Sequence, residues 1–398
     1  MSCRKEHFLP IESYGVIGNC RTIALVSSSD GSIDHLAFPH FDSPLVFGRL
    51  LTRQGGGFFE ISPADCHSQW TSKQLYLPSS NVLVTKYLGA KEGIGQVTDF
   101  MPVAKGDERK CETLTEALVR KAFEEEEVRT NECSREAEDE TAHRASVRGW
   151  PWVVRRVETV RGTVKYSLCC QPAFNFGRVS HSIRRGEEPD TFLFESPVLT
   201  LQLCASISTL KEAVAPIRWS VQEETVAYEC EEGLTVSLPR LVGEFELREY
   251  QSVYFVLREP GDGETARPSP ELLSGLLVDT NAMWRDWLHR CTYRGRWRET
   301  VQRSALALKL MTFAPTGAII AAPTTSLPEV LGDSMNFDYR YVWLRDAAFT
   351  VYAFLRIGLT EEAKARGGLV LILFLTLCFS GVLFFFRLLF CHCSPRTL

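Results

Sequence analysis

The chain has 398 residues, of which 45% are hydrophobic and 23% are charged, as in an ordinary globular protein with room for two or three domains. A net charge of −5 and a pI near 6.0 do not provide the basic surface that nucleic-acid binding needs, so we expect no nucleic-acid partner. Thirteen cysteines without a CxxC spacing exclude a small secreted disulfide framework.

The first two thirds of the chain read as strands. Short apolar runs such as "TIALVS" and "SVYFVL" are separated by turn signals such as "SSDGS" and "GDGE". This pattern predicts an antiparallel β-sandwich domain over residues 8–260. A charged stretch at about 105–148, with the run Glu124 to Glu127, interrupts it. We interpret that stretch as a solvated insertion without a function of its own.

The apolar period changes to a helical one after residue 269. Leu272 to Leu288 fit an amphipathic linker helix within 269–297. A second helix is predicted at about 298–313 and a third at 346–357, where Gly358 suits the C-terminal cap. Thr360 then reads as the N-cap of a fourth helix.

The C-terminal part of the chain is apolar. Residues 369–386 contain no charged side chain over 18 positions, and the apolar character extends to 390. Such a helix would be roughly 27 Å long, close to the hydrocarbon thickness of a bilayer. We therefore predict a transmembrane helix at 369–390, with a buried core helix or an error in the gene prediction as the alternatives. The N-terminus "MSCRKEHFLP" has no apolar core of a signal peptide, which predicts a cytoplasmic protein, membrane-anchored if the span is real.

An aromatic strip precedes the third predicted helix. In "YRYVWLRDAAFT", Tyr339, Tyr341 and Trp343 alternate with other residues, and Arg345 and Asp346 follow. Aromatic rings suit the flat C–H faces of a sugar, and an Arg–Asp pair can donate to and accept from its hydroxyl groups. The strip is therefore a candidate sugar-binding site. The alternative is structural: Asp346 caps the helix, Arg345 forms an ion pair, and the aromatic residues belong to the core.

Several stretches resemble one known family. "NFDYRYVWLRDAAFT", at 336–350, resembles the first substrate-binding loop of glycoside hydrolase family 15, which contains glucoamylases, glucodextranases and trehalase-like enzymes. The N-terminal part is similar to the β domain of the trehalase-like branch. The stretches that carry this second similarity are 14–51, "VTDFMP" at 97–102, "VVRRVETVRG" at 153–162 and "PAFNFGR" at 172–178. The resemblance runs in order from about residue 8 to 363.

The resemblance implies a substrate and a binding site. The family substrate is an α-linked glucoside such as trehalose or a malto-oligosaccharide. By position in the motif, Arg345 and Asp346 would bind hydroxyl groups of the terminal glucose. Trp343 and Tyr339 would shape the same pocket, and Tyr341 matches another aromatic position there. No cofactor is implied, and the consecutive Cys391, His392 and Cys393 cannot easily converge on one metal ion.

The residue patterns and the resemblance together predict the fold. We expect an α+β multidomain chain. It has an N-terminal antiparallel β-sandwich, a linker helix, the opening helices of an incomplete (α/α)6 barrel at 298–363, and a final hydrophobic helix. The family's inverting mechanism uses two glutamates in later hairpins of the barrel. Neither has a counterpart here, so we assign no catalytic residue. We interpret the chain as an inactive or C-terminally truncated relative of an inverting, exo-acting α-glucoside hydrolase. The alternative function is that of a membrane-anchored, non-catalytic carbohydrate-binding or interaction protein.

Overall fold

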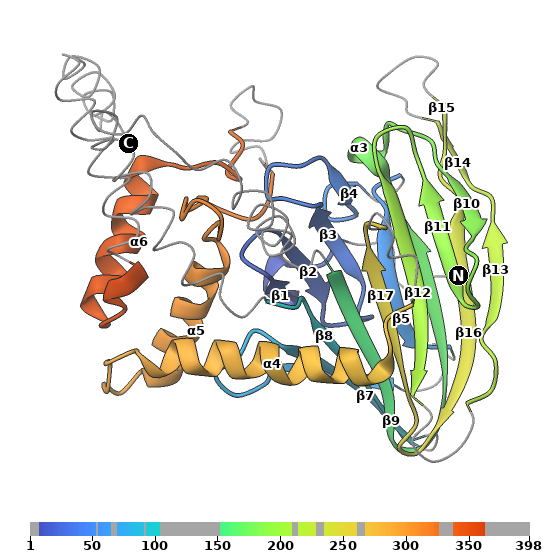
Figure 1. Cartoon of the computed structure of the whole chain (residues 1–398), viewed down its shortest axis with the longest axis horizontal. Coiled ribbons are helices and arrows are strands. Elements are labelled where there is room, and N and C mark those ends of the chain that lie inside the picture. Colours follow the sequence, from blue (N-terminus) through green and yellow to red (C-terminus); the bar gives the residue numbers. More distant parts are fainter. Residues whose placement is uncertain are drawn as a thin grey trace, which may run out of the picture.

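The structure is a computed structural model. It describes residues 8–52, 55–64, 70–90, 93–103, 152–208, 214–227, 235–260, 267–325 and 337–362. The strands come first in the chain and the three long helices follow; the first of them runs beneath the strands, and the other two lie on the far side of the molecule (Figure 1). The predicted charged insertion and the predicted hydrophobic helix both lie outside the described residues.

Fifteen strands form one connected antiparallel network, because β9 pairs in two sheets. The first sheet follows the order β1-β2-β3-β5-β9-β16-β13, with β4 beside β3. Its strands are β1 (Tyr14–Gly18), β2 (Ile23–Ser27), β3 (Ile33–Ala37), β4 (Leu45–Phe47), β5 (Phe58–Pro63), β9 (Trp152–Gln171), β13 (Arg218–Gln222) and β16 (Arg240–Arg248).

The second sheet follows the order β6-β7-β8-β9-β17-β12-β11-β10. Its further strands are β6 (Trp70–Tyr76), β7 (Leu83–Gly89), β8 (Gly93–Phe100), β10 (Ser182–Arg185), β11 (Thr191–Glu195), β12 (Thr200–Ser208) and β17 (Ser252–Arg258). A separate hairpin consists of β14 (Thr225–Ala227) and β15 (Thr235–Ser237), and two short helical segments are η1 (Ile11–Ser13) and α3 (Phe174–Gly177).

Strand β9 connects the two sheets. Its N-terminal half pairs with β8 and β17, and its C-terminal half pairs with β5 and β16. Gly162, between the halves, has a φ of 75°, a left-handed conformation that glycine adopts without strain. The single 20-residue strand β9 is therefore part of both sheets.

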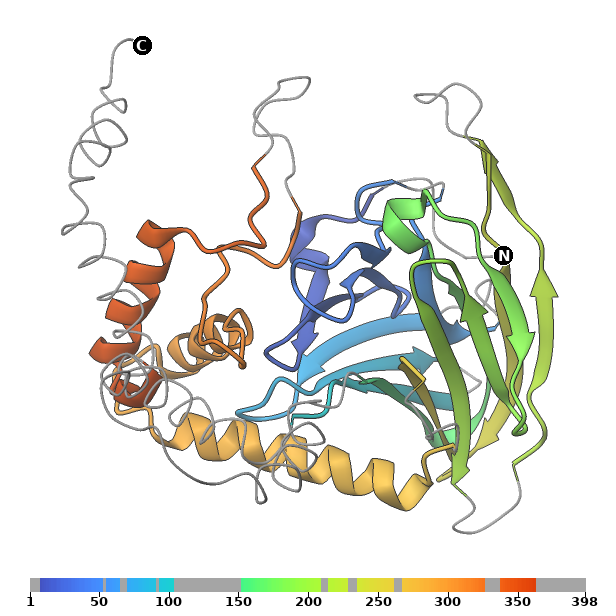
Figure 2. The ribbon, with the colours of Figure 1, turned by 45° about the horizontal axis from the view of Figure 1, so that its top comes forward.

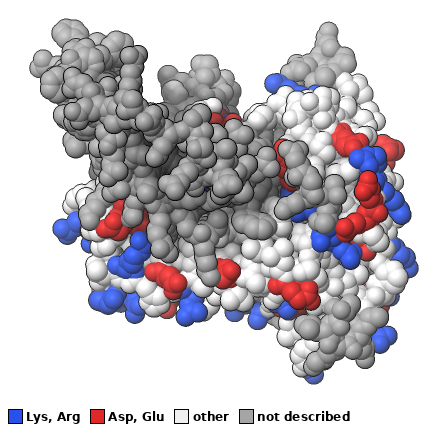
Figure 3. Space-filling view, in the orientation of Figure 1, with Lys and Arg blue, Asp and Glu red and all other residues white. Residues whose placement is uncertain are grey.

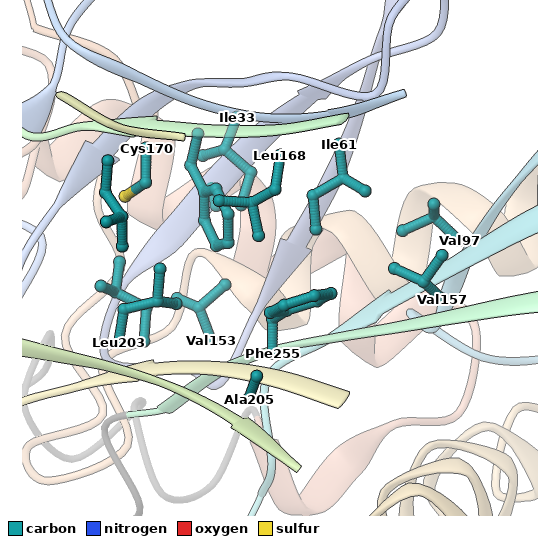
Figure 4. Close-up of a cluster of buried hydrophobic side chains, with 14 of the residues drawn as sticks. Ile33, Ile61, Val97, Val153, Val157, Leu168, Cys170, Leu203, Ala205 and Phe255 are labelled. Atoms are coloured by element: carbon teal, nitrogen blue, oxygen red, sulfur yellow. The ribbon is translucent and has the colours of Figure 1, made fainter. Parts of the chain in front are cut away.

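The core of the β domain lies between the two sheets. Figure 4 shows Ile33, Ile61 and Leu168 on one side of it and Leu203 and Phe255 on the other. All five side chains are fully buried. The apolar runs of the sequence thus supply the inward faces of two layers, and the prediction of an antiparallel β domain is confirmed.

A buried ion pair lies inside this domain. Arg155 of β9 donates from Nε to Asp99 Oδ1 of β8 at 2.8 Å, and both side chains are fully buried. The same guanidinium donates to the carbonyl oxygens of Phe59 and Gly31. It therefore joins both sheets from the inside. This contact gives a structural role to two of the family-like stretches, "VTDFMP" and "VVRRVETVRG".

Three long helices follow the β domain: α4 (Pro270–His289), α5 (Arg298–Leu310) and α6 (Leu344–Arg356). Helix α4 begins with Ser269, whose side chain accepts a hydrogen bond from Leu272 N, and with Pro270 in its first turn. It runs from the sandwich to α5 and α6, as both ribbon views show (Figure 2). Helix α6 is followed by Gly358, which has a φ of 84° as predicted for a C-terminal cap.

The helices pack on the β domain through a common apolar cluster. Phe41 and Ile23 of the β domain contribute to it, together with Trp284 and Trp287 of α4 and Phe354 of α6. The cluster also contains buried side chains from α5, so it spans all three helices. Burying these large side chains stabilises the contact between the two parts of the chain.

A polar contact also fixes α5 on the β domain. Arg303 donates to Ser80 O at 2.8 Å and to the side chain of Asn81, and its guanidinium lies 3.9 Å from the ring centroid of Tyr76.

In the part of the chain that the structure describes, no helix is long and apolar enough to cross a membrane. On the face seen in Figure 3, acidic and basic side chains are interspersed.

Candidate functional site

The aromatic strip forms a loop that is hydrogen-bonded to the segment after α5. Ala322 N donates to Tyr339 O at 2.8 Å, and Ala321 N donates to Tyr341 O at 3.0 Å. Ile320 and Val342 form an isolated antiparallel bridge. These backbone contacts define the loop of residues 337–343, which we call the aromatic loop.

Two of the three predicted aromatic side chains lie together. The rings of Tyr339 and Trp343 are stacked, with centroids 5.3 Å apart and planes at 10°. Phe337 meets Trp343 edge-on at 5.6 Å. Tyr341 is 53% exposed, and its ring makes no aromatic contact with a described residue. The sequence analysis did not single out Phe337, although it lies within the quoted motif.

Arg345 and Asp346 occupy the first turn of α6. Trp343 is the N-cap residue and no side chain caps this helix, so the prediction that Asp346 caps it is wrong. The ion pair of Arg345 that the same structural alternative predicted is present. Arg345 Nη2 lies 3.3 Å from Asp346 Oδ2, and the two side chains are 67% and 40% exposed. This oxygen is itself buried and accepts no hydrogen bond from a described residue, so the exposed part of the Asp346 side chain excludes Oδ2. The guanidinium of Arg345 and the rest of the Asp346 carboxylate lie at the surface, two and three positions after Trp343.

A second Arg–Asp pair lies in the same loop. Arg340 Nη2 donates to Asp338 Oδ2 at 2.8 Å, and Arg340 is almost completely buried. Partial burial raises the pKa of Asp338, but hydrogen bonds and charge from Arg340 outweigh it and hold the pKa below its ordinary value. Asp338 is thus a fixed anion, and the sequence analysis gave Arg340 no role.

Another buried carboxylate lies after α6. Glu362 accepts hydrogen bonds from the indole of Trp287 and from Lys309, and it pairs with Arg290 at 3.5 Å. Burial raises the pKa of Glu362, but the charge of Lys309, the indole bond and Arg290 together lower it below the ordinary value. Glu362 is therefore an ionised structural residue that connects α4 and α5 to the segment after α6.

His35 connects β3 to the segment next to the aromatic loop. Its Nε2 lies 3.0 Å from Pro323 O, and the side chain is fully buried. Burial lowers the pKa of His35 to about 4; the bond to Pro323 opposes this shift and the charge of Arg340 adds to it. His35 is therefore neutral at neutral pH and donates to the carbonyl.

This burial predicts a pH-dependent stability. As the pH falls from 6.5 to about 4, the unfolded chain binds the proton before the folded chain does, so acid favours unfolding. His35→Gln removes that difference. We expect the wild type to lose up to about 3 kcal/mol more unfolding free energy than His35→Gln between pH 7 and pH 4. Urea unfolding of both proteins at pH 7 and at pH 4 measures this difference. Equal losses of unfolding free energy in the two proteins would show that His35 is not buried in its neutral form.

Comparison with known proteins gives two family matches. The family described as Glycosyl hydrolases family 15 matches residues 295–369, which include the aromatic loop, Arg345 and Asp346. The family described as Trehalase-like, N-terminal matches residues 4–122. The two matches thus cover the beginning of the β domain and the region of α5 and α6.

Individual relatives agree with these matches. A trehalase of Mycolicibacterium smegmatis is 30% identical over 366 residues, which cover 90% of this chain and 46% of the relative. A trehalase of Thermoplasma acidophilum is 29% identical over 339 residues, which cover 85% of this chain and 47% of the relative. The chain therefore spans about half the length of the curated relatives that it matches.

A solved structure shows the same fold. A bacterial glucoamylase complexed with acarbose aligns with a TM-score of 0.52 at 13% sequence identity, over 90% of this chain and 49% of that chain. At this identity the similarity concerns the fold alone. With the two family matches and the trehalase relatives, it confirms the predicted resemblance of this chain to the trehalase-like branch of glycosyl hydrolase family 15.

Proposed function

We propose that the aromatic loop and the first turn of α6 bind the terminal glucosyl ring of an α-linked glucoside, such as trehalose or a malto-oligosaccharide. Arg345 and Asp346 bind its hydroxyl groups, Trp343 and Tyr339 cover an apolar face of the ring, and Tyr341 contacts it from the exposed side of the loop. The observation that carries the proposal is the exposed Arg345–Asp346 pair beside the Tyr339–Trp343 stack.

The physical support is a match of chemistry. Charge-assisted hydrogen bonds from a guanidinium and to a carboxylate are the strong ones. Sugar hydroxyl groups can accept from the guanidinium of Arg345 and donate to the exposed part of the Asp346 carboxylate, because the two side chains are 67% and 40% exposed. The trehalase names of the relatives and the glucoamylase of similar fold support an α-glucoside as the ligand class.

Bond cleavage requires different carboxyl groups. A general acid in glycoside hydrolysis must keep its proton, which requires a raised pKa. The pKa values of Asp338 and Glu362 are lowered instead, and Asp346 is assigned to binding. We therefore propose that α5 and α6 belong to an (α/α)6 barrel and that the acid and the base of an inverting reaction are two glutamates without a counterpart among these 398 residues. By itself, the 398-residue chain binds the glucoside without hydrolysing it.

Titration calorimetry of the 398-residue protein tests this function. Methyl α-glucoside is compared with methyl α-galactoside, which differs only in the orientation of one hydroxyl group. We expect binding of the glucoside and at least about tenfold weaker binding of the galactoside, because one hydrogen bond to a charged group is lost. A parallel assay of glucose release from maltose and trehalose should give none. Equal affinities would refute the site, and rapid glucose release would refute the assignment of the catalytic groups.

A further inference from the structure

The aromatic loop is attached to the β domain by Arg340, whose guanidinium uses all three of its nitrogen atoms. Nε and Nη2 donate to the carboxylate of Asp338 at 2.8 to 3.2 Å, inside the loop. Nη1 donates to Phe41 O at 3.2 Å and to Ser43 O at 2.6 Å, in the turn before β4. This planar fork suits a guanidinium, and the single ammonium of a lysine could not make the same set of bonds.

A second segment of the β domain meets the same side chain. Arg340 Cζ lies 5.9 Å from the ring centroid of Phe176, in α3. Asn175 and Phe176 have φ values of 51° and 60°, a left-handed conformation that is costly for residues other than glycine. The turn is tied to β4, because Ala173 N donates to Val46 O at 2.8 Å. The left-handed turn thus presents Phe176 to Arg340.

We propose that Arg340 is a positioning residue through which the β domain holds the sugar-binding geometry of the aromatic loop. That the ligand is an α-glucoside rests on the proposed function. Arg340 lies between Tyr339 and Tyr341, whose carbonyl groups accept from Ala322 and Ala321. The β domain holds Arg340 on one side of the loop, and Ala321 and Ala322 hold the two carbonyl groups on the other side. Together these contacts fix the backbone conformation of the loop. The β domain therefore contributes to ligand affinity without touching the ligand.

Hydrogen exchange and calorimetry together test this role. In Arg340→Met, we expect the amides of Ala321 and Ala322 to exchange at least about tenfold faster than in the wild type, because their acceptors are no longer held. Affinity for methyl α-glucoside should fall by at least about tenfold as well. The amide of Leu168, deep in the β domain, should exchange as in the wild type, which shows that the fold is retained.

Arg345→Met is the matched control, since it removes the exposed guanidinium of the same region. It should weaken glucoside binding and leave the exchange of Ala321 and Ala322 unchanged. Unchanged exchange in Arg340→Met would overturn the inference, and so would faster exchange with wild-type affinity. If the wild type binds no glucoside, the proposed function fails, while the exchange rates still decide whether Arg340 holds the loop.

If Arg340→Met does not fold, Asp338→Asn provides the same comparison. It retains the bonds of Arg340 to Phe41 and Ser43 and weakens only the anchor within the loop. A smaller change of the same sign is expected in both the exchange rates and the affinity. An exchange pattern and an affinity identical to those of the wild type would overturn the inference.

Discussion

Replacing Arg155 by methionine is expected to lower the free energy of unfolding by about 3–5 kcal/mol, as for other buried ion pairs that lose one partner. The variant leaves the fully buried carboxylate of Asp99 without its cation. It also removes the donor to the carbonyl oxygens of Phe59 and Gly31. Because the guanidinium connects both sheets, the loss should affect the whole β domain. Urea unfolding followed by circular dichroism measures it.

Arg184→Met is the matched control. Its partner is Glu195 at 2.8 Å, but the two side chains are 56% and 38% exposed, so water screens the pair. The expected loss is at most about 1 kcal/mol. The double variant Asp99→Leu with Arg155→Met should be more stable than Arg155→Met alone, because no buried charge remains unpaired. A loss in Arg155→Met as small as that of the control would show that the buried pair contributes little.

Asp346→Asn is expected to weaken the binding of methyl α-glucoside by about 10- to 100-fold, which corresponds to one hydrogen bond to a charged group. The substitution preserves the shape of the side chain and removes the charge that a hydroxyl donor meets. It should leave the unfolding free energy nearly unchanged, because Asp346 does not cap α6 and its side chain is 40% exposed. Calorimetry and urea unfolding of the same preparation give both values.

Asp286→Asn controls for the loss of one negative charge. Asp286 is an exposed residue of α4, outside the aromatic loop and the first turn of α6. The affinity of the Asp286→Asn variant for methyl α-glucoside should equal that of the wild type. If Asp346→Asn and Asp286→Asn bind equally well, Asp346 does not bind the sugar.

Local patterns in the sequence predicted the elements that depend on neighbouring residues. The helical period predicted α4, and Gly358 follows α6 in the left-handed conformation that a C-terminal cap needs. The strand pattern predicted an antiparallel β domain because turn residues separated the apolar runs. It did not predict that β9 would continue through Gly162 and join both sheets, since a glycine within an apolar run reads as a break.

The contacts that hold the site join residues far apart in the chain, which limits prediction from a single sequence. Arg340 lies 297 positions after Ser43, and Arg155 lies 56 positions after Asp99. The sequence analysis grouped Tyr339, Tyr341 and Trp343 in one aromatic strip, whereas the structure stacks Tyr339 on Trp343 and leaves Tyr341 apart. That arrangement follows from the turn at residues 339–340, which the pattern did not reveal.

A crystal structure of the protein with methyl α-glucoside would show whether the aromatic loop and the first turn of α6 bind a glucosyl ring. We expect a hexose against the Tyr339–Trp343 stack. Its hydroxyl oxygens should lie about 2.7–3.0 Å from the guanidinium of Arg345 and the carboxylate of Asp346. A hexose bound elsewhere, or one that touches neither of these two side chains, would show that the loop is not the glucoside site.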